Sequence, residues 1–258
     1  MTEILNEQAY NNGMKKSLLD KIFFIDKIDA TTFVDYGCAD GTLLNYIGEM
    51  FPAYKYYGYD ISENMIKLAN KNKTNNNITF TTSFDNILGK ISRSTDKKVL
   101  ILSSVIHEVY AYAPKKDIEL FWERVFNSNF DYIVIRDMVL DNHVVDRATS
   151  SQDLVNLFYN ANDDKLQEFQ DIYGSVKWKD NFIHYLLKYR YVENWNREVR
   201  ENYLPLTKQE LLRLVPRKYK VILEEHYILP FLKERIKKDF SIVLTDNTHI
   251  KIILKREI

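Results

Sequence analysis

Glycine is scarce in this chain and is concentrated in one stretch. Seven glycines occur in 258 residues, and four of them (Gly37, Gly41, Gly48 and Gly58) lie between residues 37 and 58. Gly37 directly follows the largely apolar run Phe33-Val34-Asp35-Tyr36, and Gly41 comes four residues later. Because glycine costs backbone entropy on folding, a chain that uses so little of it indicates a backbone requirement at this place. The pattern predicts a tight strand-to-helix turn where the backbone approaches a ligand closely.

An acidic residue ends the next apolar segment. Tyr56-Tyr57-Gly58-Tyr59-Asp60 follows the glycine turn, and the Asp60 carboxylate can accept hydrogen bonds from both hydroxyls of a ribose. A dinucleotide site of the form G-x-G-x-x-G needs glycine at 37, 39 and 42, where the chain has Gly37, Ala39 and Thr42. The two segments therefore predict a nucleoside cofactor and argue against a dinucleotide.

Asp35 narrows the choice of cofactor, since it lies two residues before the first glycine of the turn. A carboxylate there would repel a pyrophosphate, but it can face the positively charged amino acid end of S-adenosylmethionine. The run Val34-Asp35-Tyr36-Gly37-Cys38-Ala39-Asp40-Gly41 resembles the first motif of class I S-adenosylmethionine-dependent methyltransferases, and Tyr59-Asp60-Ile61-Ser62 resembles their second. Ala39 replaces the usual middle glycine, a departure that a small side chain should accommodate. The alternative is an ordinary turn beside an incidental Asp.

The resemblance covers about residues 31–138 and 206–256 and implies S-adenosyl-L-methionine as the cofactor. It implies that Asp60 takes the ribose hydroxyls and that Ile61 packs against the adenine. It places the adenine contacts after the third strand and the methionine part of the cofactor after the fourth. The cofactor-binding residues that it implies are Asp35, Gly37, Ala39, Gly41, Asp60, Ile61, Ser83, Phe84 and Ser103.

The hydrophobic pattern alternates between strands and helices. An amphipathic helix is expected at 14–28, strands at 32–36, 55–60, 78–81, 99–103 and 132–135, and helices at 43–50, 63–70 and 115–126. Such alternation predicts an α/β fold with a parallel sheet. Two last strands are expected at 219–223 and 249–254 around a helical insert at 231–240, and a T-x-x-E capping box starts a helix at Thr207. With the family resemblance, this predicts a seven-stranded, mostly parallel sheet flanked by helices, with a helical cap inserted after strand five.

Four segments are expected along the chain. They are an N-terminal helical lid at 1–30, the cofactor-binding half of the α/β domain at 31–140, a helical, acceptor-binding cap at 141–205 and the C-terminal part of the α/β domain at 206–258. Charge is balanced, with 36 basic and 36 acidic residues. One cysteine excludes an internal disulfide, and no apolar run reaches the length that spans a bilayer, so a soluble cytoplasmic protein is the default expectation.

His107 and Glu108 are the acid–base candidates. They follow the fourth predicted strand in Ser103-Ser104-Val105-Ile106-His107-Glu108, which resembles the family's fourth motif, and histidine titrates near neutral pH. The alternative is that His107 only positions this loop. Asp137 ends the fifth strand and is expected near the substrate. The five histidines show no metal-ligand spacing, so no metal is expected, although His107 and Glu108 could assemble a site with Asp137 or His143.

The segment 178–203 is expected to determine which acceptor the protein binds. It interleaves Tyr and Trp rings with Lys and Arg, and the residues expected to bind the substrate are Tyr185, Tyr189, Arg190 and Trp195, besides Asp137. Several rings follow helical spacing, which favours packing of the cap over ligand binding. The rival interpretation is an aromatic, basic cleft for a nucleotide or an RNA end.

We expect direct methyl transfer from S-adenosylmethionine to a small-molecule acceptor. A nucleotide or RNA acceptor is the first alternative, because residues 177–220 carry eleven basic and five acidic residues, a net of +6. An NAD enzyme and a non-catalytic cofactor-binding partner protein are the alternatives from other classes.

Overall fold

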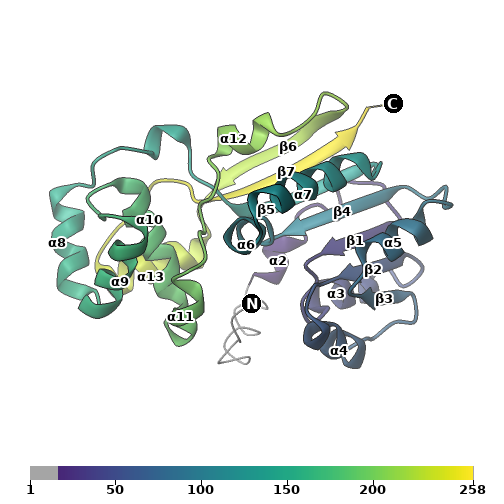
Figure 1. Cartoon of the computed structure of the whole chain (residues 1–258), viewed down its shortest axis with the longest axis horizontal. Helices are drawn as coiled ribbons and strands as arrows, with labels where there is room; N and C mark the ends of the chain where they lie inside the picture. The colour runs from purple at the N-terminus through teal and green to yellow at the C-terminus, as the bar shows by residue number, and fades with distance from the viewer. Residues whose placement is uncertain (1–16, 258) are drawn as a thin grey trace.

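The computed structural model describes residues 17–257, apart from the side chains of Arg190 and Tyr191. Its centre is a seven-stranded sheet in the order β3-β2-β1-β4-β5-β7-β6 (Figure 1). The first five strands are parallel, and β7 runs antiparallel to both of its neighbours. The predicted seven-stranded, mostly parallel sheet is therefore confirmed. The strands are β1 (Thr32–Tyr36), β2 (Lys55–Tyr59), β3 (Ile78–Thr81), β4 (Lys98–Ser103), β5 (Tyr132–Met138), β6 (Tyr219–Tyr227) and β7 (His249–Arg256).

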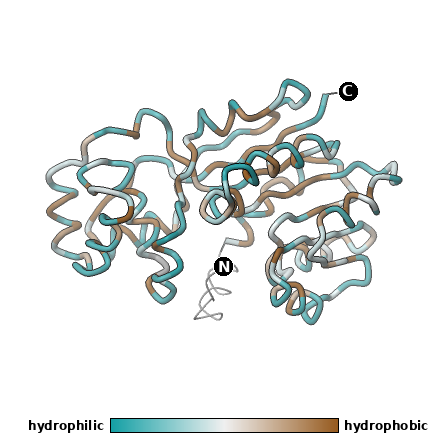
Figure 2. Tube along the Cα trace, viewed as in Figure 1, coloured by the Kyte–Doolittle hydropathy of each residue, from teal (hydrophilic) through white to brown (hydrophobic). Residues whose placement is uncertain are grey.

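Helices between the parallel strands cover both faces of the sheet. Successive side chains of β4 point to opposite faces, so Leu100 enters one core cluster and Val99 the other, and both are completely buried. A parallel sheet covered on both faces needs such continuous apolar strands, and Figure 2 shows the hydrophobic residues concentrated along them. The helices are α3 (Thr42–Met50), α4 (Glu63–Lys71), α5 (Phe84–Ile91), α6 (Ile106–Tyr112) and α7 (Lys115–Asn127).

Gly41 makes the turn between β1 and α3 possible. Its φ of 77° is left-handed, and a Cβ on it would lie 2.5 Å from the Phe80 ring. The predicted tight strand-to-helix turn is present, and glycine is required there both by the backbone angle and by packing against β3.

The N-terminal helix is shorter than expected. The periodicity predicts a helix at 14–28, but α2 covers only Leu18–Lys21 and turns follow up to residue 27. The Asp20 carboxylate contacts Arg136 and Lys251 at 2.9 and 2.7 Å, while Phe24 is fully buried against the sheet. These tertiary contacts override the helical pattern. The part of the predicted lid at 1–16 lies outside the described residues.

The cap forms at one end of the sheet from two separate stretches of chain (Figure 1). Helix α13, which connects β6 to β7, shares the cap's hydrophobic core through Leu232, Ile236 and Phe240. The segment 206–258 was expected to lie wholly in the α/β domain, and α13 departs from that expectation. None of the described helices combines the length and apolar character needed to cross a bilayer. The other cap elements are η1 (Asn142–Val144), α8 (Ser151–Asn160), α9 (Asp163–Tyr173), α10 (Lys179–Lys188), η2 (Tyr189–Asn194) and α11 (Trp195–Glu198), and α12 (Lys208–Arg213) packs on the sheet domain.

Candidate active site

A cavity opens where the carboxyl ends of the parallel strands face the cap. This is the place where open α/β sheets bind ligands. The sheet domain contributes Asp35, Gly37, Ala39, Asp60, Ser103, His107 and Glu108, and the cap contributes Leu187, Arg197, Glu198, Glu201, Tyr203 and Leu232. Seven of the residues expected to bind cofactor or act in catalysis therefore meet in one cavity.

The Asp60 carboxylate is held in place by the glycine turn. One carboxylate oxygen accepts the Ala39 N–H at 3.0 Å, and the other accepts the Ser62 N–H at 2.8 Å. Burial raises the pKa of Asp60, and these two backbone hydrogen bonds partly offset that effect. The turn itself is fixed to β2, because the N–H groups of Gly37 and Cys38 donate to the Tyr59 carbonyl. The structure thus places a preoriented carboxylate beside the left-handed backbone of Gly37 and Ala39, whose φ angles are 81° and 46°.

Asp35 and Ser103 are two buried polar groups at the same wall of the cavity. Burial raises the pKa of Asp35 to about 7, Lys21 lowers it in part, and the nearby Asp60 raises it further. Among the described residues, the buried Ser103 hydroxyl has no hydrogen-bond partner. A buried hydroxyl without a partner carries a free-energy cost, which a polar ligand in this cavity would relieve. Both groups therefore fit a ligand with a cationic and hydrogen-bonding end.

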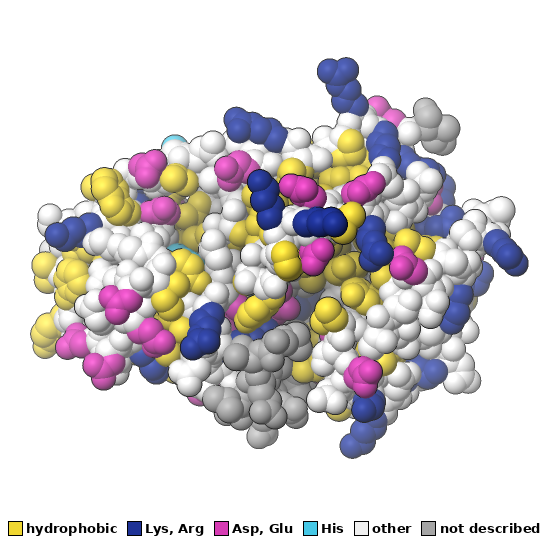
Figure 3. Space-filling view, viewed as in Figure 1, with side chains coloured by type: hydrophobic (Ala, Val, Ile, Leu, Met, Phe, Trp, Pro, Cys, Tyr) yellow, Lys and Arg dark blue, Asp and Glu magenta, His cyan; other side chains and the backbone are white. Residues whose placement is uncertain are grey.

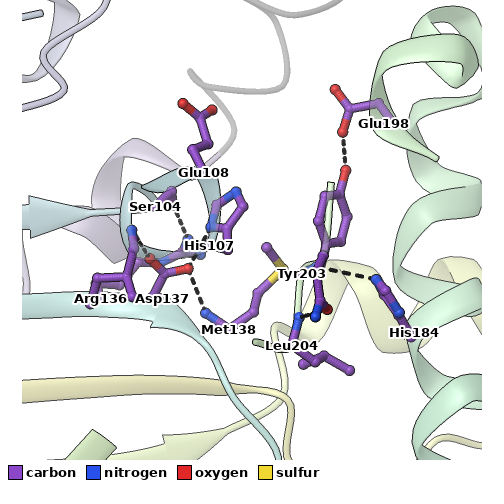
Figure 4. A network of polar contacts seen from close by, with 12 residues as sticks. Ser104, His107, Glu108, Arg136, Asp137, Met138, His184, Glu198, Tyr203 and Leu204 are labelled. Carbon is purple, nitrogen blue, oxygen red and sulfur yellow. Dashed lines mark hydrogen bonds and ion pairs between the residues drawn. The ribbon is translucent and has the colours of Figure 1, made fainter. Parts of the chain in front are cut away.

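His107 is fixed by Asp137 (Figure 4). The Nδ1 atom of His107 lies 2.6 Å from one Asp137 oxygen, which also accepts the Met138 N–H, and the other oxygen accepts the Ile106 N–H at 2.7 Å. Burial alone would lower the pKa of His107, but the Asp137 carboxylate outweighs burial and raises that pKa to about 9. His107 is therefore an imidazolium at neutral pH. Asp137 was expected to contact the substrate, whereas it lies behind His107 and does not line the cavity.

Glu108 links the sheet domain to the cap. Its carboxylate lies 3.1 Å from Arg197 Nη2, and Arg197 Nε lies 2.9 Å from Glu201. Burial raises the pKa of Glu108 to about 7, and Glu201 adds to the rise while His107 and Arg197 oppose it. Glu108 can therefore exchange a proton near neutral pH. His107, Glu108 and Glu201 place ligand atoms within 4.8 Å of one another, but Arg197 occupies the position between the two carboxylates by contacting both of them, so we assign no metal to them.

The cap side of the cavity is held by a buried polar network. The Tyr203 hydroxyl donates to the Glu198 carboxylate, and the Tyr203 N–H donates to His184 Nε2 at 3.1 Å (Figure 4). The Lys188 ammonium donates to the backbone carbonyls of Glu198 and Glu201, and burial lowers its pKa to about 7. These contacts fix the segment that presents Arg197, Glu198 and Glu201 to the cavity. Sequence reasoning missed these three residues and Tyr203, although the i,i+4 pair of Arg197 and Glu201 is visible in the sequence.

Several predicted site residues lie elsewhere. Tyr185 and Trp195 are buried in the cap core, and Tyr189 packs against Phe240 with ring centroids 4.6 Å apart. The helical spacing of these rings therefore reflects packing, and they do not line the cavity. The side chain of Arg190 lies outside the described part of the structure.

The two residues after β3 also have structural roles. Ser83 caps α5 by accepting the Asn86 N–H, and Phe84 is 3% exposed beneath Tyr36 and Tyr59. Ile61 is 74% exposed, and Gly41 supports the turn without lining the cavity. Of these expected cofactor contacts, Ile61 alone has a side chain free to contact a ligand.

Comparison with known proteins identifies a family over more than half of the chain. A family model described as a methyltransferase domain matches residues 27–172. Similar solved structures include a SAM-dependent methyltransferase from Anabaena variabilis, with 13% identity over 98% of this chain and 96% of that chain and a TM-score of 0.52. Another is the plantazolicin methyltransferase BamL in complex with triazolic desmethylPZN analog and SAH, with 12% identity over 97% and 90% of the two chains and a TM-score of 0.51. At these identities the likeness concerns the fold. A search of curated proteins gives no match.

Proposed function

The chain belongs to the methyltransferase domain family, and we propose that it transfers a methyl group from S-adenosyl-L-methionine to a small-molecule acceptor held between the cap and the sheet edge. The observation that carries this proposal is the cavity itself, because the preoriented Asp60 carboxylate and the buried Asp35 and Ser103 groups meet in it. When bound, the cofactor supplies a methyl group activated by a sulfonium.

Under this proposal, different residues of the cavity bind different parts of the cofactor. Asp60 is placed to accept hydrogen bonds from ribose hydroxyls, since its own position is fixed by the Ala39 and Ser62 amides. Asp35 is placed to face an ammonium group, which would stabilise its ionised form and lower its raised pKa. The backbone of the glycine turn allows a ligand to approach without meeting a side chain at Gly37.

Glu108 and His107 have different roles toward the acceptor in this proposal, because their pKa values differ. At neutral pH the His107 imidazolium cannot accept a proton, while Glu108, with a pKa of about 7, can both accept and release one. His107 therefore acts as a hydrogen-bond donor that orients the acceptor, and Glu108 acts as the base. Alignment of the acceptor with the methyl donor in the cavity supplies much of the remaining rate enhancement, because the methyl donor is already activated.

The charges of the cap favour a small molecule over a nucleic acid. The Lys188 ammonium is buried against backbone carbonyls, and Arg197 is paired with two carboxylates, so neither presents a free charge to a phosphate. On the face drawn in Figure 3, acidic side chains gather over the cap. Of the charged side chains of 177–220 that the structure describes, Arg197, Glu198 and Glu201 line the cavity, so the net charge of +6 over this segment is not the charge that faces the acceptor.

Calorimetric titration with S-adenosylmethionine, S-adenosylhomocysteine and NAD tests the proposal. We expect both adenosyl ligands to bind with micromolar affinity and NAD not to bind. Asp60→Asn should weaken S-adenosylhomocysteine binding by about 10- to 100-fold, because the charge of the hydrogen-bond acceptor is removed. Asp164→Asn, at an exposed position of α9, is the matched control and should bind normally. Absence of affinity for either adenosyl ligand would overturn the proposal.

A further inference from the structure

Three carboxylates form an acidic wall where the cap meets helix α6 at the cavity. The wall consists of Glu108, Glu198 and Glu201, all of which line the cavity. Glu198 and Glu201 are 4% and 2% exposed. Buried carboxylates are costly unless cations compensate them, so the number of cations available to this wall is informative.

Among the described residues, the three carboxylates of this wall share one ion-paired cation, Arg197, and the His107 imidazolium, which acts on Glu108 and Glu201, is itself paired with Asp137. Arg197 forms ion pairs with Glu108 and Glu201, and it acts on Glu198 by lowering the pKa of that carboxyl group. Among the described residues, the carboxylate of Glu198 has one hydrogen-bond partner, the neutral Tyr203 hydroxyl, and forms no ion pair. Lys188 bonds backbone carbonyls rather than carboxylates, and its lowered pKa leaves it only partly charged at neutral pH. Among the described residues, Glu198 is therefore a buried carboxyl group at the cavity with no cation in contact; burial raises its pKa, and Arg197 and Lys188 oppose that rise from a distance.

The sheet side of the cavity has carboxylates of its own, Asp35 and Asp60, and Lys21 lowers the pKa of Asp35. Under the proposed function these two carboxylates face the cofactor, whereas Glu198 and Glu201 come from the cap and face the acceptor.

We propose that the acceptor is a small organic amine, bound as its ammonium by Glu198 and Glu201 and methylated on nitrogen. This inference rests on the proposed function and adds the chemical class of the acceptor. The apolar side chains of Leu187 and Leu232, at the same end of the cavity, would contact the carbon part of the amine.

The reaction follows from the position of Glu108. The ammonium gives one proton to the Glu108 carboxylate, and the nitrogen lone pair then forms a bond to the methyl carbon. The bond between that carbon and sulfur breaks, and its electron pair stays on sulfur, which becomes a neutral thioether. The products are a methylated ammonium, S-adenosylhomocysteine and protonated Glu108, which releases its proton to water as the cavity opens. Its pKa of about 7 suits both proton transfers.

Three probes of similar shape and different charge test the class of acceptor. They are 2-phenylethylamine, 2-phenylethanol and 3-phenylpropionate, titrated by calorimetry at pH 7.5 into the protein saturated with S-adenosylhomocysteine. We expect the amine to bind at least about tenfold more tightly than the alcohol, and the carboxylate not to bind, since charge-assisted hydrogen bonds are the stronger ones. Glu198→Gln should reduce the preference for the amine to less than about threefold and leave S-adenosylhomocysteine affinity unchanged. Glu193→Gln, at an exposed position, is the matched control and should keep the preference.

The outcomes separate this inference from the proposed function. Failure to bind S-adenosylhomocysteine contradicts the proposed function. If S-adenosylhomocysteine binds, three results would contradict the proposal that the acceptor is an amine. They are equal affinity for the amine and the alcohol, no binding of the amine, and a preference for the amine that persists in Glu198→Gln. Tight binding of Mn²⁺ that disappears in Glu201→Gln would assign the acidic wall to a metal instead. Thermal melting of each variant verifies that it is folded, and Gln at 198 can still accept the Tyr203 hydrogen bond.

Discussion

Asp137 is buried behind His107 and determines the charge of that imidazole. The carboxylate accepts two backbone N–H groups besides the His107 ring, so it stays in place whatever the cavity contains. His107, in turn, opposes the rise in the pKa of Glu108. Asp137 is thus a positioning residue that acts on the site through His107.

The variant Asp137→Asn tests this chain of effects. Without the carboxylate, burial should dominate and the pKa of His107 should fall from about 9 to below its ordinary value of 6.5. NMR titration of the His107 ring in the unchanged protein and in the variant measures this change. A pKa that stays near 9 in the variant would show that another group charges His107.

At the scale of elements, the β1–α3 turn depends on a residue without a Cβ. Gly41 combines a left-handed φ with close contacts to Phe80 and Ala69, which come from β3 and α4. The turn is thus where four elements come together, and its glycine serves packing as much as ligand access.

Gly41→Ala should destabilise the protein by about 2–4 kcal/mol, because the new methyl group meets the Phe80 ring and the backbone is strained. Gly89→Ala is the matched control, since Gly89 lies inside α5 and a Cβ there would meet no atom within 4 Å. That control should stabilise the protein by about 0.5–1 kcal/mol through helix propensity. Urea unfolding measures both. Equal effects of the two substitutions would contradict the packing argument.

Most elements of the sheet domain can be read from the sequence. β1 and β3 have the predicted bounds, and β2 and β4 differ by one residue at one end, because turns bound continuous apolar strands clearly. Helix α6 was not predicted: its seven residues, Ile106–Tyr112, are too few to show a periodic pattern. The expected helix at 14–28 is wrong beyond Lys21, because contacts of Asp20 and Phe24 with the distant sheet decide that segment.

At the scale of the whole molecule, Arg197 joins the cap to the sheet domain. It comes from α11 and contacts Glu108 of α6, while Tyr112, also of α6, donates to Glu201 at 2.8 Å. The two parts of the molecule therefore meet through charges that line the cavity, and we expect ligand binding to depend on the position of the cap.

Arg197→Leu should destabilise the protein by about 3–5 kcal/mol, because it leaves Glu108 and Glu201 without their shared counter-ion. Arg197→Lys should cost less, since it keeps the charge and loses the forked geometry. Denaturant unfolding compares these variants with Arg213→Leu, an exposed control in α12. Stability of Arg197→Leu equal to that of the unchanged protein would show that the link contributes nothing.

The pH dependence of the free energy of unfolding measures how much the His107–Asp137 ion pair stabilises the protein. The raised pKa of His107 means that its stabilisation is complete below pH 6.5 and is lost as pH rises through about 9. The lowered pKa of Asp137 means that its own contribution is lost as pH falls below its ordinary value of 3.8. The difference in unfolding free energy between the unchanged protein and Asp137→Asn should thus be largest near pH 5–6 and decrease by on the order of 2–3 kcal/mol by pH 9.5. A difference that stays constant or grows over this range would contradict the assignment.

The sheet, the glycine turn and the position of the Asp60 carboxylate can be derived from the sequence, because these depend on local backbone needs and on apolar runs within single segments. The positions of His107 and Glu108 at the cavity follow as well, since the ends of parallel strands meet at one edge. The acceptor side of the cavity depends instead on how distant segments pack. Arg197, Glu198, Glu201 and Tyr203 come to the cavity through the packing of the cap on α13 and α6, whereas Tyr185 and Trp195 turn into its core. A helical pattern of aromatic and charged residues shows that one face is buried, but the partner element determines which face that is.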